Sequence, residues 1–140
     1  MKLLSNVTDI LHRDLYYFCS ERLKEEGLTT GLMYFILFVA KNPDCTPTDL
    51  GDALKLDKAY VLRCLKKLTE EGFLIREPHP TDKRASLLRC TERGERVFHM
   101  CREMFTEWDE DRLRGLSEDE KEQLFTLLAK IKTTQGRKIL

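Results

Sequence analysis

Residues 43–90 constrain the fold more than any other part of the chain, because they hold two short helix patterns and a hairpin pattern in close succession. Thr46 precedes Pro47, and Asp49 lies three residues after Thr46, which is the pattern of a capped helix start. Asp57 marks a second start only a few residues after the first helix pattern ends. Two short helices separated by so few residues indicate a helix-turn-helix unit.

The hydrophobic period changes after Gly72, which suits the end of the second helix over residues 58–71. We expect strands over residues 73–77 and 85–90, joined by the polar, proline-containing turn of residues 78–84. A hairpin directly after a helix-turn-helix is called a wing. The second helix should bury a stripe of apolar side chains, which comprises Val61, Leu62, Leu65 and Leu68.

Helical patterns flank this unit on both sides. Apolar residues recur at intervals of three and four over residues 8–26, and Gly27 suits the cap that ends such a helix. Residues 31–41 are apolar all round, which predicts a central, buried helix. A further helix is expected over residues 91–114, and a last one begins after the capping box of Ser117 and Glu120. The fold class is therefore mainly α with a small β-hairpin (α+β).

Charge is balanced over the whole chain but not along it. The 140 residues have a formal net charge of zero, so a basic total does not point to nucleic acid. Residues 55–89, however, contain nine Lys or Arg and five Asp or Glu, whereas residues 107–122 contain three and eight. The middle of the chain is thus basic and its last third acidic, which makes the helix-turn-helix and wing the candidate surface for an anionic partner.

The second short helix has the features of a recognition helix, whose N-terminal end enters the major groove of DNA. Lys58, Ala59, Tyr60 and Arg63 lie near that end and away from the apolar stripe. Arg63 can bind guanine with two hydrogen bonds, and Tyr60 can contact a base edge or a phosphate. We expect Lys66 and Lys67, one turn later, to contact phosphates.

The tip of the wing provides a second set of candidate contacts. Lys83 and Arg84 are basic, and a basic side chain at a narrow tip can enter the minor groove. Asp82 cannot attract phosphate, so we expect it to orient its neighbours through an ion pair or a turn hydrogen bond.

Other classes of function find little support. The sequence contains no hydrolase, phosphate-loop or zinc-protease motif, so we predict neither catalytic residues nor an enzyme. The five cysteines are widely spaced and form no C-x-x-C motif, so we expect buried thiols, no metal and no cofactor. The chain has no long apolar run and no secretory signal pattern, which predicts a cytoplasmic protein without a membrane partner.

The chain resembles the multiple-antibiotic-resistance regulator (MarR) family of winged-helix repressors. The resemblance covers nearly the whole chain, and the residues that carry it, in order, are Leu28-Thr29, Pro43, Thr46, Leu50, Ala53-Leu54, Val61, Leu65, Leu68, Glu71-Gly72-Phe73-Leu74, Arg76, Pro80, Asp82, Arg84 and Leu88 to Gly94 with Thr91-Glu92-Arg93-Gly94.

The resemblance implies a homodimer that binds duplex DNA at a pseudo-palindromic site. It also implies one domain over residues 1–140, in which residues 1–27 and 115–140 dimerise, 31–90 form the winged helix-turn-helix and 91–114 connect them. The apolar stripes of the first and last helices support this division.

Family members respond to small ligands, often phenolic or aromatic, or to thiol oxidation. The architecture would place an effector pocket between the first, second and fifth helices, with His12, Tyr16, Met33 and Tyr34 as candidate lining residues. Two alternatives remain open from the sequence. One is a redox-sensing regulator that uses Cys19, which lies beside two tyrosines. The other is a winged helix that binds another protein.

Overall fold

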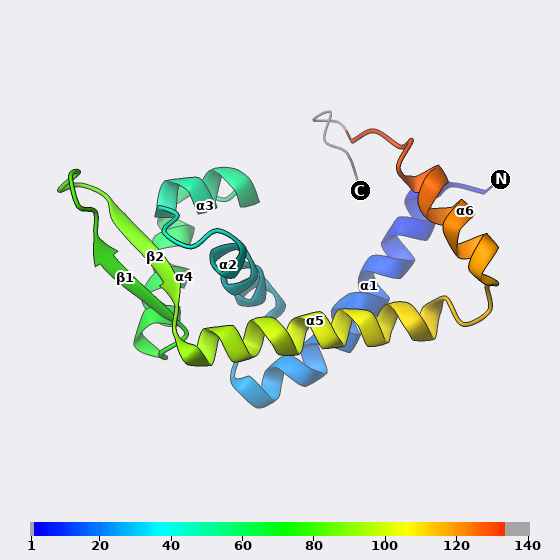
Figure 1. Cartoon of the computed structure of the whole chain (residues 1–140), viewed down its shortest axis with the longest axis horizontal. Coiled ribbons are helices and arrows are strands. Elements are labelled where there is room, and N and C mark those ends of the chain that lie inside the picture. Colours follow the sequence, from blue (N-terminus) through cyan, green and yellow to red (C-terminus); the bar gives the residue numbers. More distant parts are fainter. Residues whose placement is uncertain (1, 134–140) are drawn as a thin grey trace. The chain divides into compact units, whose positions relative to one another are not determined.

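The computed structural model describes residues 2–133. The chain divides after Met104 into two compact units. The elements in chain order are α1 (Leu4–Leu23), a 3-10 turn η1 (Lys24–Glu26), α2 (Thr30–Lys41), α3 (Pro47–Leu54), α4 (Lys58–Glu70), β1 (Leu74–Pro78), β2 (Ser86–Cys90), α5 (Glu92–Arg112) and α6 (Glu118–Leu128) (Figure 1). This mainly helical fold with one hairpin confirms the expected class.

The first helix differs from the prediction at both ends. α1 begins at Leu4, four residues before the expected start, and no side chain caps it. Its last turn tightens into η1, and Gly27 then adopts a left-handed φ of 71°, as its role in ending the helix requires. The early start went unpredicted because an uncapped helix leaves no signal in the sequence.

The buried core of the first unit is built around α2. Met33, Phe35, Ile36 and Val39 are at most 1% exposed, which confirms that this helix is central. Thr29 caps it by accepting a hydrogen bond from Leu32 N at 3.3 Å. Buried residues from the neighbouring elements complete the core, and they include Leu50, Leu65, Leu68, Phe73 and Leu88.

The helix-turn-helix forms as its caps predict. The Thr46 hydroxyl accepts from Asp49 N at 3.1 Å, and the Asp49 carboxylate accepts from Thr46 N at 2.8 Å, so the capping box of α3 is complete. The Asp57 carboxylate accepts from Tyr60 N at 3.0 Å at the start of α4. Lys55 turns the chain between the helices with a left-handed φ of 58°.

The stripe on α4 needs one correction. Val61, Leu65 and Leu68 are buried as expected, but Leu62 is only half-buried and Cys64 takes the fourth buried position. Residue 64 lies three positions after Val61 and four before Leu68, so it faces the same side of the helix, whereas Leu62 lies at the border of that face.

The hairpin is an antiparallel pair in which Leu74 lies opposite Cys90 and Pro78 opposite Ser86. It projects beyond α3 and α4 on one side of the first unit (Figure 1). Its base is held by an isolated bridge between Cys45 and Leu88, which ties β2 to the loop before α3. The wing is therefore anchored to the helix-turn-helix at its base and projects freely at its tip.

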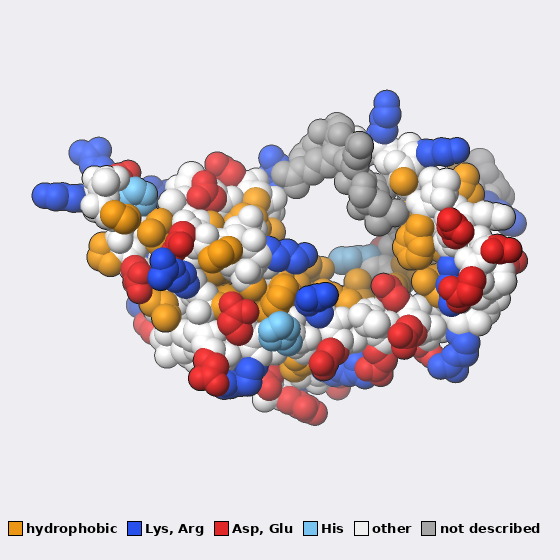
Figure 2. Space-filling view, viewed as in Figure 1, with side chains coloured by type: hydrophobic (Ala, Val, Ile, Leu, Met, Phe, Trp, Pro, Cys, Tyr) orange, Lys and Arg blue, Asp and Glu red, His pale blue; other side chains and the backbone are white. Residues whose placement is uncertain are grey.

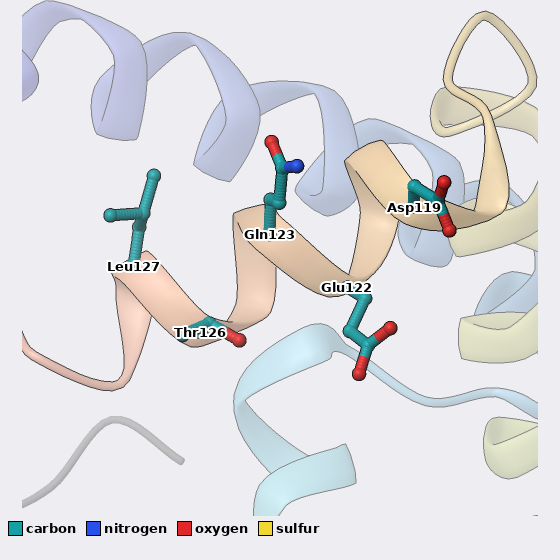
Figure 3. A pocket seen from close by; sticks show the side chains of 5 residues that line it. All are labelled: Asp119, Glu122, Gln123, Thr126 and Leu127. Atoms are coloured by element: carbon teal, nitrogen blue, oxygen red, sulfur yellow. The ribbon is translucent and has the colours of Figure 1, made fainter.

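The second unit contains the end of α5 and the helix α6, whose capping box of Ser117 and Glu120 is present as predicted. Phe125 and Leu127 are 42% and 61% exposed. Five side chains of α6 border a hollow of about 530 Å³ (Figure 3), but Gln123 and Leu127 point to one side of the helix and Glu122 to the other. They follow the helix surface and enclose no site. Within residues 2–133, no helix is both long and apolar enough to cross a membrane.

Candidate nucleic-acid interface

The N-terminal half of α4 presents an exposed basic surface. Lys58, Ala59 and Arg63 are exposed, and Ala59 and Arg63 lie on the side of the helix opposite the buried stripe. Because Asp57 caps the helix and satisfies Tyr60 N, this end is fixed while its side chains remain accessible. Such a helix end can enter a groove and present Arg63 to a base edge.

Lys66 and Lys67 extend the basic surface by one turn and are also exposed. The Lys66 ammonium lies 3.9 Å from the Glu70 carboxylate, a pair of mostly exposed side chains that solvent screens strongly. This geometry leaves the Lys66 ammonium available to an anion, as the predicted phosphate contact requires.

Tyr60 is placed differently from its neighbours. Its ring packs edge-on against the Phe35 ring, with 6.3 Å between the ring centroids. Its hydroxyl lies close to Gly31 of α2, 3.5 Å from where a Cβ of that glycine would be. A hydrogen bond with Cys64, together with the nearby charge of that group, raises the pKa of Tyr60. The side chain therefore anchors α4 on α2. The Arg63 guanidinium lies 5.7 Å from the Tyr60 ring centroid, so Tyr60 also supports Arg63.

The wing tip presents Lys83 and Arg84, which are both exposed. Figure 2 shows Lys and Arg side chains at the outer end of the hairpin. The turn hydrogen bond expected of Asp82 is present, because its carboxylate accepts from Arg84 N at 2.9 Å. Asp82 thus fixes the backbone of Arg84, one of the two cations at the wing tip.

His79 is a residue that sequence reasoning left unassigned. Its Nδ1 atom accepts from Asp82 N at 3.0 Å and from Thr81 N at 3.2 Å. The ring lies inside the turn and accepts hydrogen bonds from these two backbone N–H groups. Within a sheet, carbonyl groups of a neighbouring strand would accept such bonds. The only signal in the sequence is its place between Pro78 and Pro80, which marks a turn but not the acceptor.

The base of the wing is fixed by polar contacts that also escaped sequence reasoning. Arg89 Nε donates to the Asp44 carboxylate, and Arg89 lies 3.9 Å from Glu77. Arg76 Nε donates to Ser86 Oγ at 2.7 Å across the hairpin. Asp44 and Arg89 are 45 residues apart, so no local pattern could have paired them.

Two hollows flank α4. One of about 150 Å³ lies between α3 and α4, and its border includes Gly51, Leu56 and Val61. The other, of about 440 Å³, lies between α4 and β1 and is bordered by Leu62, Lys66, Thr69, Glu70 and Arg76. Both adjoin the basic surface, so anything that filled them would lie beside the residues proposed to read a groove.

The four candidate effector residues are only partly brought together. Met33 is fully buried, His12 is exposed, and Tyr16 and Tyr34 are 49% and 43% exposed. A contact of 3.2 Å between the Ser20 and Thr30 hydroxyls joins α1 to α2 one helical turn from each tyrosine. The three hollows described above do not include these four residues, so the pocket stays a prediction.

The redox interpretation of Cys19 is opposed by the structure. The thiol is fully buried, and desolvation raises its pKa although Arg22 acts in the opposite direction. A sensing thiol needs access and a lowered pKa, because the thiolate is the reactive form. Cys19 has neither in this structure and packs as a small apolar side chain. Among residues 2–133, no three His, Cys, Asp or Glu side chains are grouped as a metal would require.

Comparison with known proteins places this architecture. A family model described as MarR family matches residues 26–85. The HTH-type transcriptional regulator BilQ of Clostridium symbiosum is 40% identical over 128 residues, which cover 91% of this chain and 89% of that protein. The chain belongs to the MarR family. It is a MarR-family transcriptional regulator with a DNA-binding winged helix-turn-helix.

Solved structures agree with this MarR-family fold. The transcriptional regulator SlyA superimposes with a TM-score of 0.79 at 26% identity, over 91% of this chain and 89% of that one. A MarR family regulator from Listeria monocytogenes, solved with a 26-mer DNA, gives a TM-score of 0.78 at 24% identity over 91% and 85%. Because its sequence identity is low, the comparison with the Listeria regulator shows only that the two proteins share a fold.

Proposed function

We propose that this MarR-family chain is a homodimeric repressor that binds a pseudo-palindromic operator and is released from it by a small aromatic effector. The observation that carries the DNA contacts is the exposed basic surface, with Lys58, Arg63, Lys66 and Lys67 on α4 and Lys83-Arg84 at the wing tip. α4 lies in the major groove with Arg63 on a base edge, while Arg84 enters the adjacent minor groove. A regulator of the same fold from Listeria was solved with a 26-mer DNA, which supports DNA as the partner.

The exposed apolar side chains of α1 support the homodimer. Leu4, Val7, Ile10 and Leu11 are 45–65% exposed at the start of α1, whereas its buried residues, Cys19 and Leu23, lie at its other end. Apolar patches of this kind mark interfaces. A two-fold dimer puts two recognition helices about 34 Å apart, one turn of DNA, which is why the operator is expected to be palindromic.

Effector release is proposed as a change in the spacing of the two recognition helices. An effector can change that spacing only by binding one arrangement more tightly than the other. The aromatic character of Tyr16 and Tyr34, which flank the contact between α1 and α2, favours a phenolic or aromatic ligand. Occlusion of polymerase by the bound dimer is the simplest route to repression.

The experiment that tests the proposal is a selection of bound DNA from a random library, followed by titration of the selected site at several salt concentrations. We expect a palindromic site whose affinity falls steeply with salt, because each phosphate contact releases counterions. A folded protein that binds no DNA, or binds it without dependence on salt, contradicts the proposal and favours a winged helix that binds protein.

Two substitutions separate the proposed roles of the basic residues. Arg63→Ala should relax sequence preference at one base pair and cost about 1–3 kcal/mol of binding free energy there. Arg84→Ala should weaken binding most at A·T-rich flanks, since narrow minor grooves attract arginine. Arg96→Ala removes an exposed cation that pairs with Glu92 on α5, and this control should leave both patterns unchanged. Equal losses on all sequences for Arg63→Ala and Arg84→Ala would refute the assignment.

A further inference from the structure

We propose that His79 is a positioning residue of the wing, and that its unprotonated Nδ1 atom holds the tip in the shape that presents Arg84. The proposal deepens the one above and rests on it, because the tip matters to function only if it touches DNA. What it adds is a dependence of the DNA contact on the protonation of one side chain.

The geometry of the turn makes His79 its centre. His79 N donates to Ala85 O at 3.2 Å and Ala85 N donates to Asp82 O at 3.1 Å, so the backbone closes the loop at its base. Inside the loop, Thr81 N and Asp82 N both point to the imidazole Nδ1, at 3.2 and 3.0 Å. The Thr81 hydroxyl lies 3.4 Å from the same atom.

These contacts form a relay from the ring to Arg84. The ring fixes Asp82 through its backbone N–H, and the Asp82 carboxylate then accepts from Arg84 N at 2.9 Å. If the first link is lost, Asp82 is free to move and the backbone of Arg84 loses its partner. His79 therefore acts on DNA through Arg84 and needs no contact of its own.

The chemistry of imidazole makes the first link sensitive to protons. An unprotonated ring nitrogen carries one lone pair and accepts hydrogen bonds, whereas both nitrogens of an imidazolium are donors. Histidine is the side chain that changes charge between about pH 5 and 8. Protonation at Nδ1 would put a donor against two backbone donors, so the ring would have to leave the turn.

Some charged groups along the hairpin would attract an imidazolium at residue 79, and others would repel it. Asp82 in the loop and Glu77 on β1 would attract it, and Glu77 is shared with Arg89 of β2 at 3.9 Å. Lys83 and Arg84 in the loop would repel it. An imidazolium drawn to the Asp82 carboxylate would compete with Arg84 N for that oxygen, so attraction by Asp82 also opens the relay.

One substitution keeps a hydrogen-bond acceptor at residue 79 but removes the group that can gain a proton. The Asn Oδ1 atom is bonded to Cγ, as Nδ1 is in histidine, and Asn side chains commonly accept from backbone N–H groups two residues on. His79→Asn should therefore keep the tip ordered at every pH, whereas His79→Ala should lose it at every pH. His99→Asn removes an exposed histidine of α5 and is the matched control.

The first measurement uses the free protein and needs no DNA. Nitrogen NMR of the ring should find Nδ1 unprotonated at pH 8, and the Thr81 and Asp82 amides should exchange slowly with solvent. At pH 5.5 the protection factors of both amides, which compare each exchange rate with that of an unstructured amide at the same pH, should fall in the wild type and in His99→Asn, but not in His79→Asn. A protonated Nδ1 at pH 8, or protection factors that are the same at both values of pH in the wild type, overturns the proposal whatever the protein binds.

The second measurement asks whether the tip reaches DNA through Arg84. The loss of affinity caused by Arg84→Ala should be about tenfold at pH 8, or about 1.4 kcal/mol, and should shrink to less than about threefold at pH 5.5. In the His79→Asn background the loss should be the same at both values of pH. A loss independent of pH in both backgrounds contradicts the relay. Failure of every variant and the wild type to bind DNA, with the amide result intact, contradicts the proposed function instead.

Discussion

Gly94 shows how one residue fixes the direction in which the chain leaves the wing. A Cβ at this position would collide with the backbone oxygen of Phe73 and lie 3.2 Å from the Cβ of Cys90. Beside it, the Thr91 hydroxyl donates to Gly72 O at 2.6 Å, and Arg93 donates to Glu71 O at 2.6 Å. The segment from Thr91 to Gly94 therefore packs α5 against the start of β1.

Gly94→Ala should destabilise the fold by about 1–3 kcal/mol, because the added methyl must push apart two backbone segments that pack closely. Urea unfolding followed by circular dichroism measures the change. Gly115→Ala is the control, since a Cβ at residue 115 meets no atom within 4 Å. Equal stability of the two variants would show that α5 can shift away from Phe73 without cost.

The buried thiols should make the stability of the fold depend on pH. Burial, with smaller contributions from Glu95 and Cys45, raises the pKa of the Cys90 thiol from 9.0 to about 12. The unfolded chain loses this proton at lower pH than the folded chain does. The stability that the neutral thiol contributes is therefore complete below pH 9 and is lost as the pH rises towards 12.

Cys90→Ala should lose less stability than the wild type when urea unfolding is repeated between pH 8 and pH 11. The comparison cancels the titration of tyrosines and lysines, which both proteins share. Parallel curves for the two proteins would mean that the Cys90 thiol ionises as easily in the folded state as in the unfolded state. The same comparison with Cys101→Ala, whose pKa burial raises to about 11, provides an independent check.

Single residues differ in how far the sequence reveals them. Asp82 could be given a turn hydrogen bond from its identity alone, because aspartate habitually accepts from backbone two residues on. His79 could not, since the same ring could point inwards or outwards and only the fold decides. Tyr60 stays predicted to contact DNA, but its packing on Phe35 could not be foreseen, because the contact joins α4 to a residue of α2 far away in the sequence.

Elements were predicted best where the chain carries its own start signals. The caps of α3, α4 and α6 are local hydrogen bonds between residues three apart, and all three are present. The start of α1 was missed because it has no side-chain cap. The anchoring of the wing through Cys45 and Leu88 was missed because it joins segments distant in the sequence.

The cap of α4 matters for both stability and function. Asp57→Ala removes the acceptor for Tyr60 N and should cost about 1 kcal/mol of folding stability. Asp57→Asn keeps an oxygen acceptor and should remain within a few tenths of a kcal/mol of the wild type. Unfolding in urea measures both. If Asp57→Asn is as destabilised as Asp57→Ala, the charge at the helix N-terminus is the stabilising feature and the hydrogen bond is not.

At the scale of the whole molecule, two surfaces are separated along the chain. The basic residues gather on α4 and the wing, whereas α1 begins with exposed apolar side chains and residues 107–122 are acidic. Net charge of zero therefore hides a basic surface on α4 and the wing that suits phosphate, while the apolar start of α1 suits another protein surface. The sequence predicted the first from local charge, and the apolar stripe alone pointed to the second.

Ile10→Glu tests whether the apolar face of α1 joins two copies of the chain. Ile10 is 65% exposed in the single chain, so the substitution should leave the fold intact, but in a dimer it would bury a charge without a partner. Sedimentation should find a dimer for the wild type and a monomer for Ile10→Glu at micromolar concentration. Ile75→Glu, on the 42% exposed Ile75 of β1, carries the same change on the wing and should stay dimeric. A dimeric Ile10→Glu protein would place the interface elsewhere, and a monomeric one should lose its preference for palindromic DNA, because a single recognition helix reads only one half-site.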